Sequence, residues 1–227
     1  NNMKLFLLFL FFISTAYAEK EWKTELGGIK VCSTRLRFPG ASKFYYKLSD
    51  DCNLYNPGDG YNYVYIDNIE VSIRGTRNNE STTIDENTDL VTVTAYPGGN
   101  RHFYLNGENA TLTLSYIKLV GGDVSSSNVP ASYGGSILIY TNGGELNLYS
   151  SIVFNNKARN GGGISAGDDS TNKNAIMNIY NSIIHNNEAT SWSGFGGGIE
   201  VCAAVATIYN TAIDNNQASV VYGGGGG

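Results

Sequence analysis

The chain has 227 residues and a formal net charge of −5. Its lysines and arginines are scattered and form no basic stripe, which argues against nucleic acid as a partner. With 28 glycines and only 15% charged residues, the composition is rich in turns and poor in charge, as in an all-β repeat protein. The three cysteines and two histidines lack the spacing of metal ligands, so we predict neither a metal site nor a cofactor.

Residues 1–18 have the features of a secretory signal peptide. Lys4 precedes an apolar run from Leu5 to Ile13. The segment Ala16-Tyr17-Ala18 offers small residues at the positions that signal peptidase reads, so we predict cleavage after Ala18. The apolar run is too short to span a bilayer, and no later stretch is long enough. We therefore expect the protein to be secreted or displayed on the cell surface, without a membrane-spanning segment in this chain.

Residues 19–59 are irregular in pattern and rich in aromatic side chains. The stacked repeats that follow would expose strand edges and an open apolar end, so we predict that this segment is an N-terminal cap. Cys32 and Cys52 both lie in it. In an exported protein we expect them to form a disulfide, worth about 3 kcal/mol in the chain-entropy model. Two separate thiols are the alternative.

Residues 60–100 show strand-like runs with weaker repetition, at 63–66, 69–73 and 90–94. We interpret these runs as early coils of a repeat domain that extends over 60–227. The polar stretch between the second and third runs is expected to be an exposed loop. Asn79 and Asn109 each begin an Asn-x-Ser/Thr triplet, and both are candidate glycosylation sites if the host is a eukaryote.

Clear repeats occupy residues 101–227. The three best copies span 146–158, 177–189 and 206–218, at a spacing of about 30 residues, which is typical of stacked-repeat architectures. A weaker copy at 110–119 is in register with them. The chain stops within a run of glycines, where we expect another glycine-led strand to begin. We therefore interpret the sequence as a fragment, truncated at the C-terminus, of a longer protein.

Apolar and polar residues alternate within each copy, which indicates β-strands rather than helices. Stacking the copies aligns Leu148, Ile179 and Ile208 in one interior column. Two further columns are Leu146–Met177–Ala206 and Val153–Ile184–Ile213. Small polar residues and Asn-Asn pairs mark corners, where asparagine tolerates a positive φ and its amide can bond the same amide in the next coil. The pattern predicts an all-β right-handed parallel β-helix, a solenoid.

The repeat resembles that of the polymorphic outer membrane proteins of chlamydial surfaces, and similar right-handed β-helix (pectin-lyase-like) regions of secreted proteins. One motif reads Gly134-Gly-Ser-Ile137, Gly161-Gly-Gly-Ile164 and Gly196-Gly-Gly-Ile199. The other reads Val153-Phe-Asn-Asn156, Ile184-His-Asn-Asn187 and Ile213-Asp-Asn-Asn216. Serine or glycine stands for the family's alanine, and an aliphatic residue for its phenylalanine. The resemblance implies a surface-displayed or secreted adhesion-type role.

Two outward-facing columns form the candidate binding surface. Tyr149, Tyr180 and Tyr209 make the first, which is either a platform for sugar rings or a partner protein or a purely stabilising aromatic ladder. The second contains His185 and Asp214, which we expect to contact each other in neighbouring coils. Beside it, we predict an ion pair between Lys157 and Glu188, worth about 0 to 1 kcal/mol.

Enzymes also use the pectin-lyase-like fold, so catalysis is the competing hypothesis. Asp168-Asp169 resembles the aspartate pair of polygalacturonase-type glycosidases, but the accompanying Gly-His-Gly and Arg-Ile-Lys elements are missing and the surrounding residues are typical of a turn. We therefore predict no catalytic residues. The favoured function is a structural or adhesive module that binds a partner protein or a polysaccharide without catalysis. The alternative is a fragment of a polysaccharide lyase or glycoside hydrolase.

Overall fold

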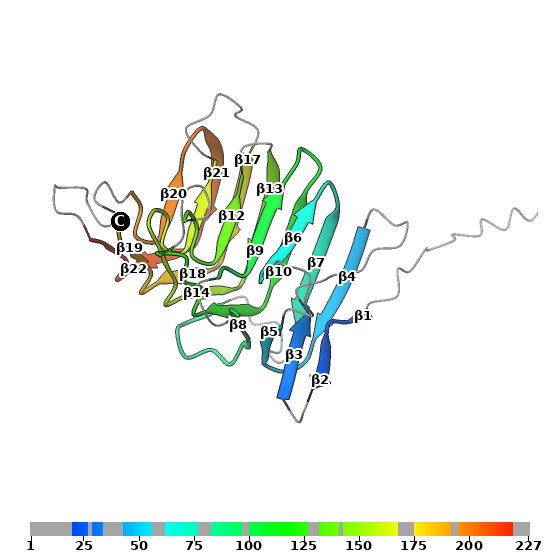
Figure 1. Cartoon of the computed structure of the whole chain (residues 1–227). Helices are drawn as coiled ribbons and strands as arrows, with labels where there is room; N and C mark the ends of the chain where they lie inside the picture. The colour runs from blue at the N-terminus through cyan, green and yellow to red at the C-terminus, as the bar shows by residue number, and fades with distance from the viewer. Residues whose placement is uncertain are drawn as a thin grey trace, which may run out of the picture.

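The computed structural model describes an all-β protein (Figure 1). It describes residues 20–26, 29–33, 43–55, 62–76, 83–96, 100–126, 132–140, 143–167, 175–191 and 195–219. The predictions made for the signal peptide, Asn79, the Asp168-Asp169 pair and the terminal glycines concern positions outside these residues.

Four sheets contain the described strands. Sheet A consists of β1 (Lys20–Glu21), β4 (Lys43–Leu48), β7 (Glu70–Gly75), β10 (Thr111–Ser115), β13 (Gly144–Tyr149), β17 (Ala175–Tyr180) and β21 (Ala204–Tyr209). Sheet B consists of β2 (Lys23–Leu26), β3 (Ile29–Ser33), β5 (Cys52–Tyr55), β8 (Val91–Thr94), β11 (Ile117–Val120), β14 (Ile152–Phe154), β18 (Ile183–His185) and β22 (Ala212–Asp214). Sheet C consists of β6 (Val64–Asp67), β9 (Phe103–Asn106), β12 (Ile137–Ile139), β16 (Ile164–Ala166) and β20 (Ile199–Val201). Sheet D consists of β15 (Lys157–Ala158), β19 (Glu188–Ala189) and β23 (Gln217–Ala218).

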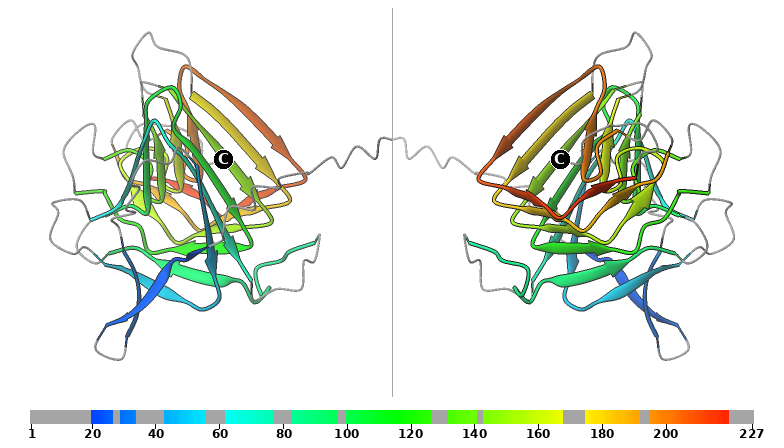
Figure 2. Two further views of the ribbon diagram at one scale, coloured as in Figure 1. Left: turned by 90° about the vertical axis from the view of Figure 1, so that its right-hand side faces the viewer. Right: turned by 90° about the vertical axis from the view of Figure 1, so that its left-hand side faces the viewer.

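Consecutive strands join these sheets in a repeating order. From β6 onward it passes from sheet C to A to B and returns to C one strand further along, with sheet D joining after β14. The strand pairings described are parallel except for the β2–β3 hairpin. The views in Figure 2 show the sheets arranged around a common interior. This topology of long parallel sheets is consistent with a parallel β-helix.

The predicted interior columns are present in register. Leu148 aligns with Ile179 and Ile179 with Ile208, and the two flanking columns align in the same way. Leu148 and Ile179 are fully buried, whereas Ile208 is 41% exposed because no described strand covers the far side of β21. Burial of these aliphatic side chains against one another is the main favourable contribution to the stability of the stack.

Residues with positive φ form the predicted corners. Asn181 and Asn210 separate the sheet A strands from the sheet B strands, with φ values of 51° and 47°. Asn186 occupies the next corner, with φ of 55°. Because asparagine tolerates this left-handed conformation better than most residues, the chain turns there without a glycine.

The segment predicted to be a cap contributes strands to both long sheets. β4 pairs in parallel with β7, and β5 pairs in parallel with β8. A disulfide joins Cys32 in β3 to Cys52 in β5, with the two Cα atoms 5.7 Å apart. Both cysteines are buried in the core. The disulfide therefore links β3, one strand of the β2–β3 hairpin, to its parallel neighbour β5 in sheet B.

A buried histidine makes the core sensitive to pH. His102 is fully buried; its Nε2 lies 3.0 Å from the carbonyl oxygen of Val93 and its Nδ1 lies 3.0 Å from the hydroxyl of Ser136. Nε2–H therefore donates to the carbonyl, and Nδ1 accepts from the serine. Burial lowers the pKa of His102 to about 4, against the opposing effect of hydrogen bonds to the backbone of Val93 and Val120.

Lowering the pH from about 7 to 4.5 is therefore expected to destabilise the protein through this histidine. Between the unfolded pKa near 6.5 and the folded pKa near 4, only the unfolded chain protonates this histidine, so the free energy of unfolding falls by about 2 to 3 kcal/mol. Urea unfolding at about pH 7 and pH 4.5 measures this loss. A His102→Gln variant should lose less over the same interval, and an imidazole NMR titration of His102 with a midpoint near 6.5 would contradict the assignment.

Candidate binding groove

The loop before β8 lies on the outer face of sheet B and creates the main candidate site. Leu90 packs against Ile152 and Ile183, and Ile84 joins this second apolar cluster from the loop. Ile152 and Ile183 point away from the interior columns yet are 0% and 9% exposed, because the loop covers them. This packing holds residues 83–86 against the outer face of sheet B at strands β14 and β18.

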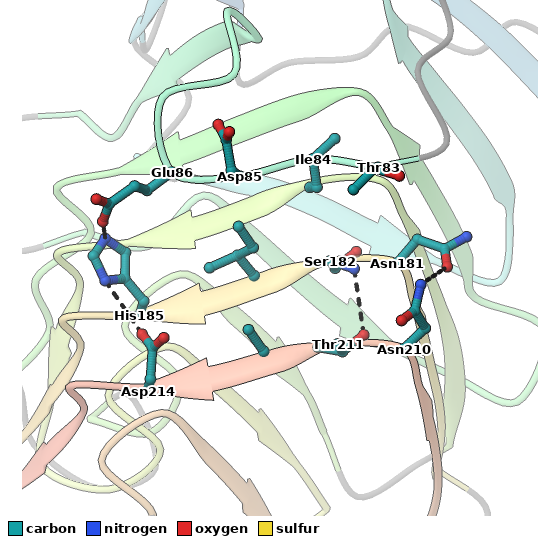
Figure 3. Close-up of a pocket in the computed structure, with 12 residues that line it drawn as sticks. Thr83, Ile84, Asp85, Glu86, Asn181, Ser182, His185, Asn210, Thr211 and Asp214 are labelled. Atoms are coloured by element: carbon teal, nitrogen blue, oxygen red, sulfur yellow. Dashed lines mark hydrogen bonds and ion pairs between the residues drawn. The ribbon is translucent and has the colours of Figure 1, made fainter.

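A groove of about 650 Å³ runs between this loop and the sheet. Figure 3 shows Thr83 to Glu86 running along one side, with β18 and β22 opposite. The groove is lined by Thr83, Ile84, Asp85, Glu86, Asn181, Ser182, Ile183, His185, Asn210, Thr211, Ala212 and Asp214. Its volume falls in the range typical of small-ligand pockets.

One end of the groove presents amides and hydroxyls. The side-chain nitrogen of Asn210 donates to the amide oxygen of Asn181 over 2.8 Å. The hydroxyl of Ser182 donates to the carbonyl of Tyr180, and that of Thr211 to the carbonyl of Tyr209. Ser182 is buried and its hydroxyl already accepts from the backbone of Ser151, so at this end the Thr211 hydroxyl offers a ligand mainly an acceptor, whereas the amides also offer donors.

The middle of the groove is apolar. Ile183 and Ala212 are register partners on β18 and β22, and Ile84 faces them from the loop. Their aliphatic carbons form a floor between the two polar ends.

The other end carries the charged side chains. His185 lies between two carboxylates, with its Nδ1 3.5 Å from Oδ1 of Asp214 and its Nε2 4.0 Å from Oε2 of Glu86. Phe154 stacks on the imidazole at a centroid distance of 4.7 Å. The His185 side chain is only 10% exposed, whereas those of Glu86 and Asp214 are 65% and 56% exposed. The carboxylates are therefore the groups at this end that can reach a ligand.

Asp85 has a different role, because it shapes the loop. Its Oδ1 accepts hydrogen bonds from the backbone of Asn87 and the hydroxyl of Thr88, and its own backbone N–H donates to Thr88. This closed turn fixes the loop conformation that presents Glu86.

The predicted tyrosine column lies just around the corner from the groove. Tyr180 and Tyr209 immediately precede Asn181 and Asn210. The rings of Tyr149 and Tyr180 stack with centroids 5.4 Å apart and planes 9° apart. In such a stack the inner ring faces cover each other, so the column presents mainly ring edges and hydroxyl groups to solvent. Tyr209 is 67% exposed because, like Ile208, it lies on β21, whose far side no described strand covers.

The structure places the remaining predicted residues as follows. The expected contact of His185 with Asp214 forms one end of the groove. Lys157 and Glu188 form the predicted ion pair at 3.0 Å, away from the groove. Asn109 is exposed in the turn before β10, accessible for the modification predicted there.

Sequence reasoning missed Glu86 and the loop that carries it. That stretch is polar and lacks the repeat pattern, so nothing in it indicated which sheet it would cover. The only signal was Ile152 and Ile183, apolar residues at positions where the alternation of the strands points outward.

Comparison of the chain with protein-family models, with curated proteins and with solved structures found no match in any of the three. No cluster of three or more histidine, cysteine or acidic side chains suited to a metal ion occurs among the described residues. Within that same part of the chain, no helix is long and apolar enough to cross a membrane.

Proposed function

We propose that this chain is part of an exported right-handed parallel β-helix that binds a polysaccharide at the groove, in an adhesive or structural role and without catalysis. The observation that carries the proposal is the order of side chains along the groove, which runs from amides through an aliphatic floor to carboxylates. In this assignment residues 1–18 are the signal peptide, 19–59 the N-terminal cap and 60–227 the β-helix, whose resemblance to the polymorphic outer membrane protein repeat remains a hypothesis.

A sugar chain has the complementary chemistry. The C–H face of each ring is apolar, and its hydroxyls lie around the edge. An aliphatic floor flanked by hydrogen-bonding groups accommodates both, since buried polar groups need partners while apolar surface gains from leaving water. A partner protein, the other ligand class expected from the sequence, would instead favour a larger apolar core in the interface.

The disulfide supports export. Such bonds persist in oxidising compartments and are rare in reducing ones, and Cys32–Cys52 closes a loop between residues that lie 20 positions apart. The resemblance to surface-displayed repeats points in the same direction.

A glycan array probed with the protein tests this function. We expect retention by at least one immobilised polysaccharide, and a loss of affinity of about tenfold or more in Ala212→Trp, whose indole would fill the groove. Glu108→Trp adds the same side chain at an exposed turn away from the groove and serves as the matched control. Binding to proteins but to no polysaccharide, or undiminished binding by Ala212→Trp, would contradict the proposal.

The same preparations distinguish binding from catalysis. The position of His185 between two carboxylates is the one arrangement that favours the enzyme alternative. However, each ring nitrogen faces a carboxylate, and none of the described residues that line the groove is a lysine or arginine. Incubation with a bound polysaccharide should therefore release no new reducing ends. Release that disappears in His185→Ala would establish the enzyme instead.

A further inference from the structure

The charge of the groove limits which polysaccharides can enter it. Its ionisable lining residues are Asp85, Glu86, Asp214 and His185, and no lysine or arginine lies among the described residues that line it. The Glu86 and Asp214 side chains are more than half exposed and stand on opposite sides of His185. A ligand carboxylate brought to this end would meet two like charges, and no lysine or arginine among the described lining residues stands beside them; Lys118 lies one ring away, over Phe154.

The outer face of β13, β17 and β21, around the corner, carries no lysine or arginine, although Arg74 follows in the same register column on β7, two strands from β13. On this face Asn147 of β13 aligns with Asn178 of β17. This asparagine column lies two residues before the tyrosine column along each strand. The amides of Asn147 and Asn178 both donate to Glu145, and Asn178 also donates to Asn147. These amides and the tyrosine hydroxyls suit the hydroxyl groups of a neutral sugar, whereas they supply no positive charge to attract a polyanion.

The two surfaces are continuous along the chain. Tyr209 ends β21, Asn210 forms the corner, and Thr211 and Ala212 enter the groove. Tyr180, Asn181 and Ser182 follow the same course one coil earlier. A ligand that occupies the amide end of the groove therefore needs only to pass one corner to reach the tyrosine column at Tyr209.

We propose that the groove and the tyrosine column form one continuous site for an extended, uncharged glycan, and that Glu86 and Asp214 exclude polyuronates from it. This inference rests on the proposed polysaccharide-binding function. The exclusion follows from repulsion between the ligand's carboxylates and those of Glu86 and Asp214. At a few ångströms in a partly solvated site, this repulsion lowers the affinity roughly tenfold. Salt screens the charges and weakens the effect.

A chemically matched pair of ligands tests the exclusion. The probes are the neutral polysaccharide that the protein retains best on the array and the same polysaccharide after oxidation of its primary alcohols to carboxylates. We expect the oxidised form to bind about tenfold more weakly at low salt, with the difference shrinking at high salt. In the double variant Glu86→Gln/Asp214→Asn the two forms should bind within about threefold of each other. Glu108→Gln removes one exposed carboxylate elsewhere and should behave like the unchanged protein.

Two results would contradict this inference in different ways. If the polysaccharides retained by the unchanged protein are polyuronates, or if the double variant still rejects the oxidised form, charge exclusion is wrong although the groove remains a glycan site. If no polysaccharide is retained at all, the proposed function itself is wrong.

Chain length tests the continuity of the site. Tyr209→Ala should weaken binding of an oligosaccharide of six or more units about threefold to tenfold, since an aromatic stack is lost, and leave a disaccharide of the same sugar unaffected. Equal effects on both lengths, or none on either, would show that the ligand does not pass the corner.

Discussion

Replacing Gly162 by alanine is expected to destabilise the protein by about 3 kcal/mol or more, because the added methyl group has no space. An alanine Cβ at this position would lie 2.5 Å from the carbonyl carbon and 2.6 Å from the nitrogen of Glu188, and closer still to the carbonyl oxygen of Gly197. All three atoms belong to the backbone of neighbouring segments, so no side chain can rotate away. The coils would have to separate, which would weaken the Gly162 N–H bond to Gly196 and the Gly163 N–H bond to Gly198.

The same restriction holds along a whole column. A Cβ at Gly122 or Gly135 would also meet a backbone carbonyl of the next coil, that of Gly135 or Gly162 respectively. The glycine clusters therefore mark a place where the backbones of successive coils leave no room for a Cβ atom, rather than points of flexibility.

Urea unfolding of Gly162→Ala measures the effect. Gly121→Asn is the matched control: Gly121 has a φ of 78°, which asparagine tolerates, and the nearest atom to its Cβ position is 3.9 Å away. We expect this control to lie within about 1 kcal/mol of the unchanged protein. A Gly162→Ala variant as stable as the control would show that the coils are not packed as closely as described.

Replacing Asn187 by alanine is expected to cost about 3 to 5 kcal/mol, since one buried side chain satisfies several backbone and side-chain groups. The two hydrogens of its amide nitrogen are shared among three acceptors at 3.0 to 3.1 Å, the carbonyls of Val153 and His185 and Oδ1 of Asn216. Its Oδ1 accepts from both the backbone N–H and the side-chain amide of Asn156, each at 3.0 Å. Asn187 is 1% exposed, so water cannot replace these partners, and each buried group left unpaired costs about 1 to 3 kcal/mol.

Chemical denaturation of Asn187→Ala and of Asn178→Ala checks this expectation. Asn178 also belongs to an inter-coil amide ladder, but it lies on the partly exposed outer face of sheet A, where water can take over its hydrogen bonds. Its loss should cost about 1 kcal/mol or less. Asn187→Asp should be nearly as destabilising as the alanine variant, because it removes the donor. Equal stabilities for the two alanine variants would refute the special role of the buried ladder.

Much of the architecture could be predicted from residues that recur at the same place in each coil. The period-two alternation around Leu148 and Ile179 identified strands and their inward faces, and the Asn-Asn pairs identified a corner and its amide ladder. These features depend on local conformation and on nearest-neighbour stacking, so each repeat carries the information about its own position. The pairing of β4 and β5 with later strands lacks that repetition, and the sequence indicated only an irregular cap there.

The same distinction, between repeated and unrepeated segments, applies to the candidate site. The sequence by itself determined the strands, the interior columns, the tyrosine column and the proximity of His185 to Asp214, because these follow from a repeat spacing that brings like positions together. Only the tertiary structure decided that residues 83–90 fold across strands of sheet B that lie about 60 to 100 positions further along the chain, covering Ile152 and Ile183 and bringing Glu86 to His185. A loop without periodicity has no preferred partner in sequence. The position of the loop depends on the apolar surface that it can bury. That surface exists only once the sheet has formed.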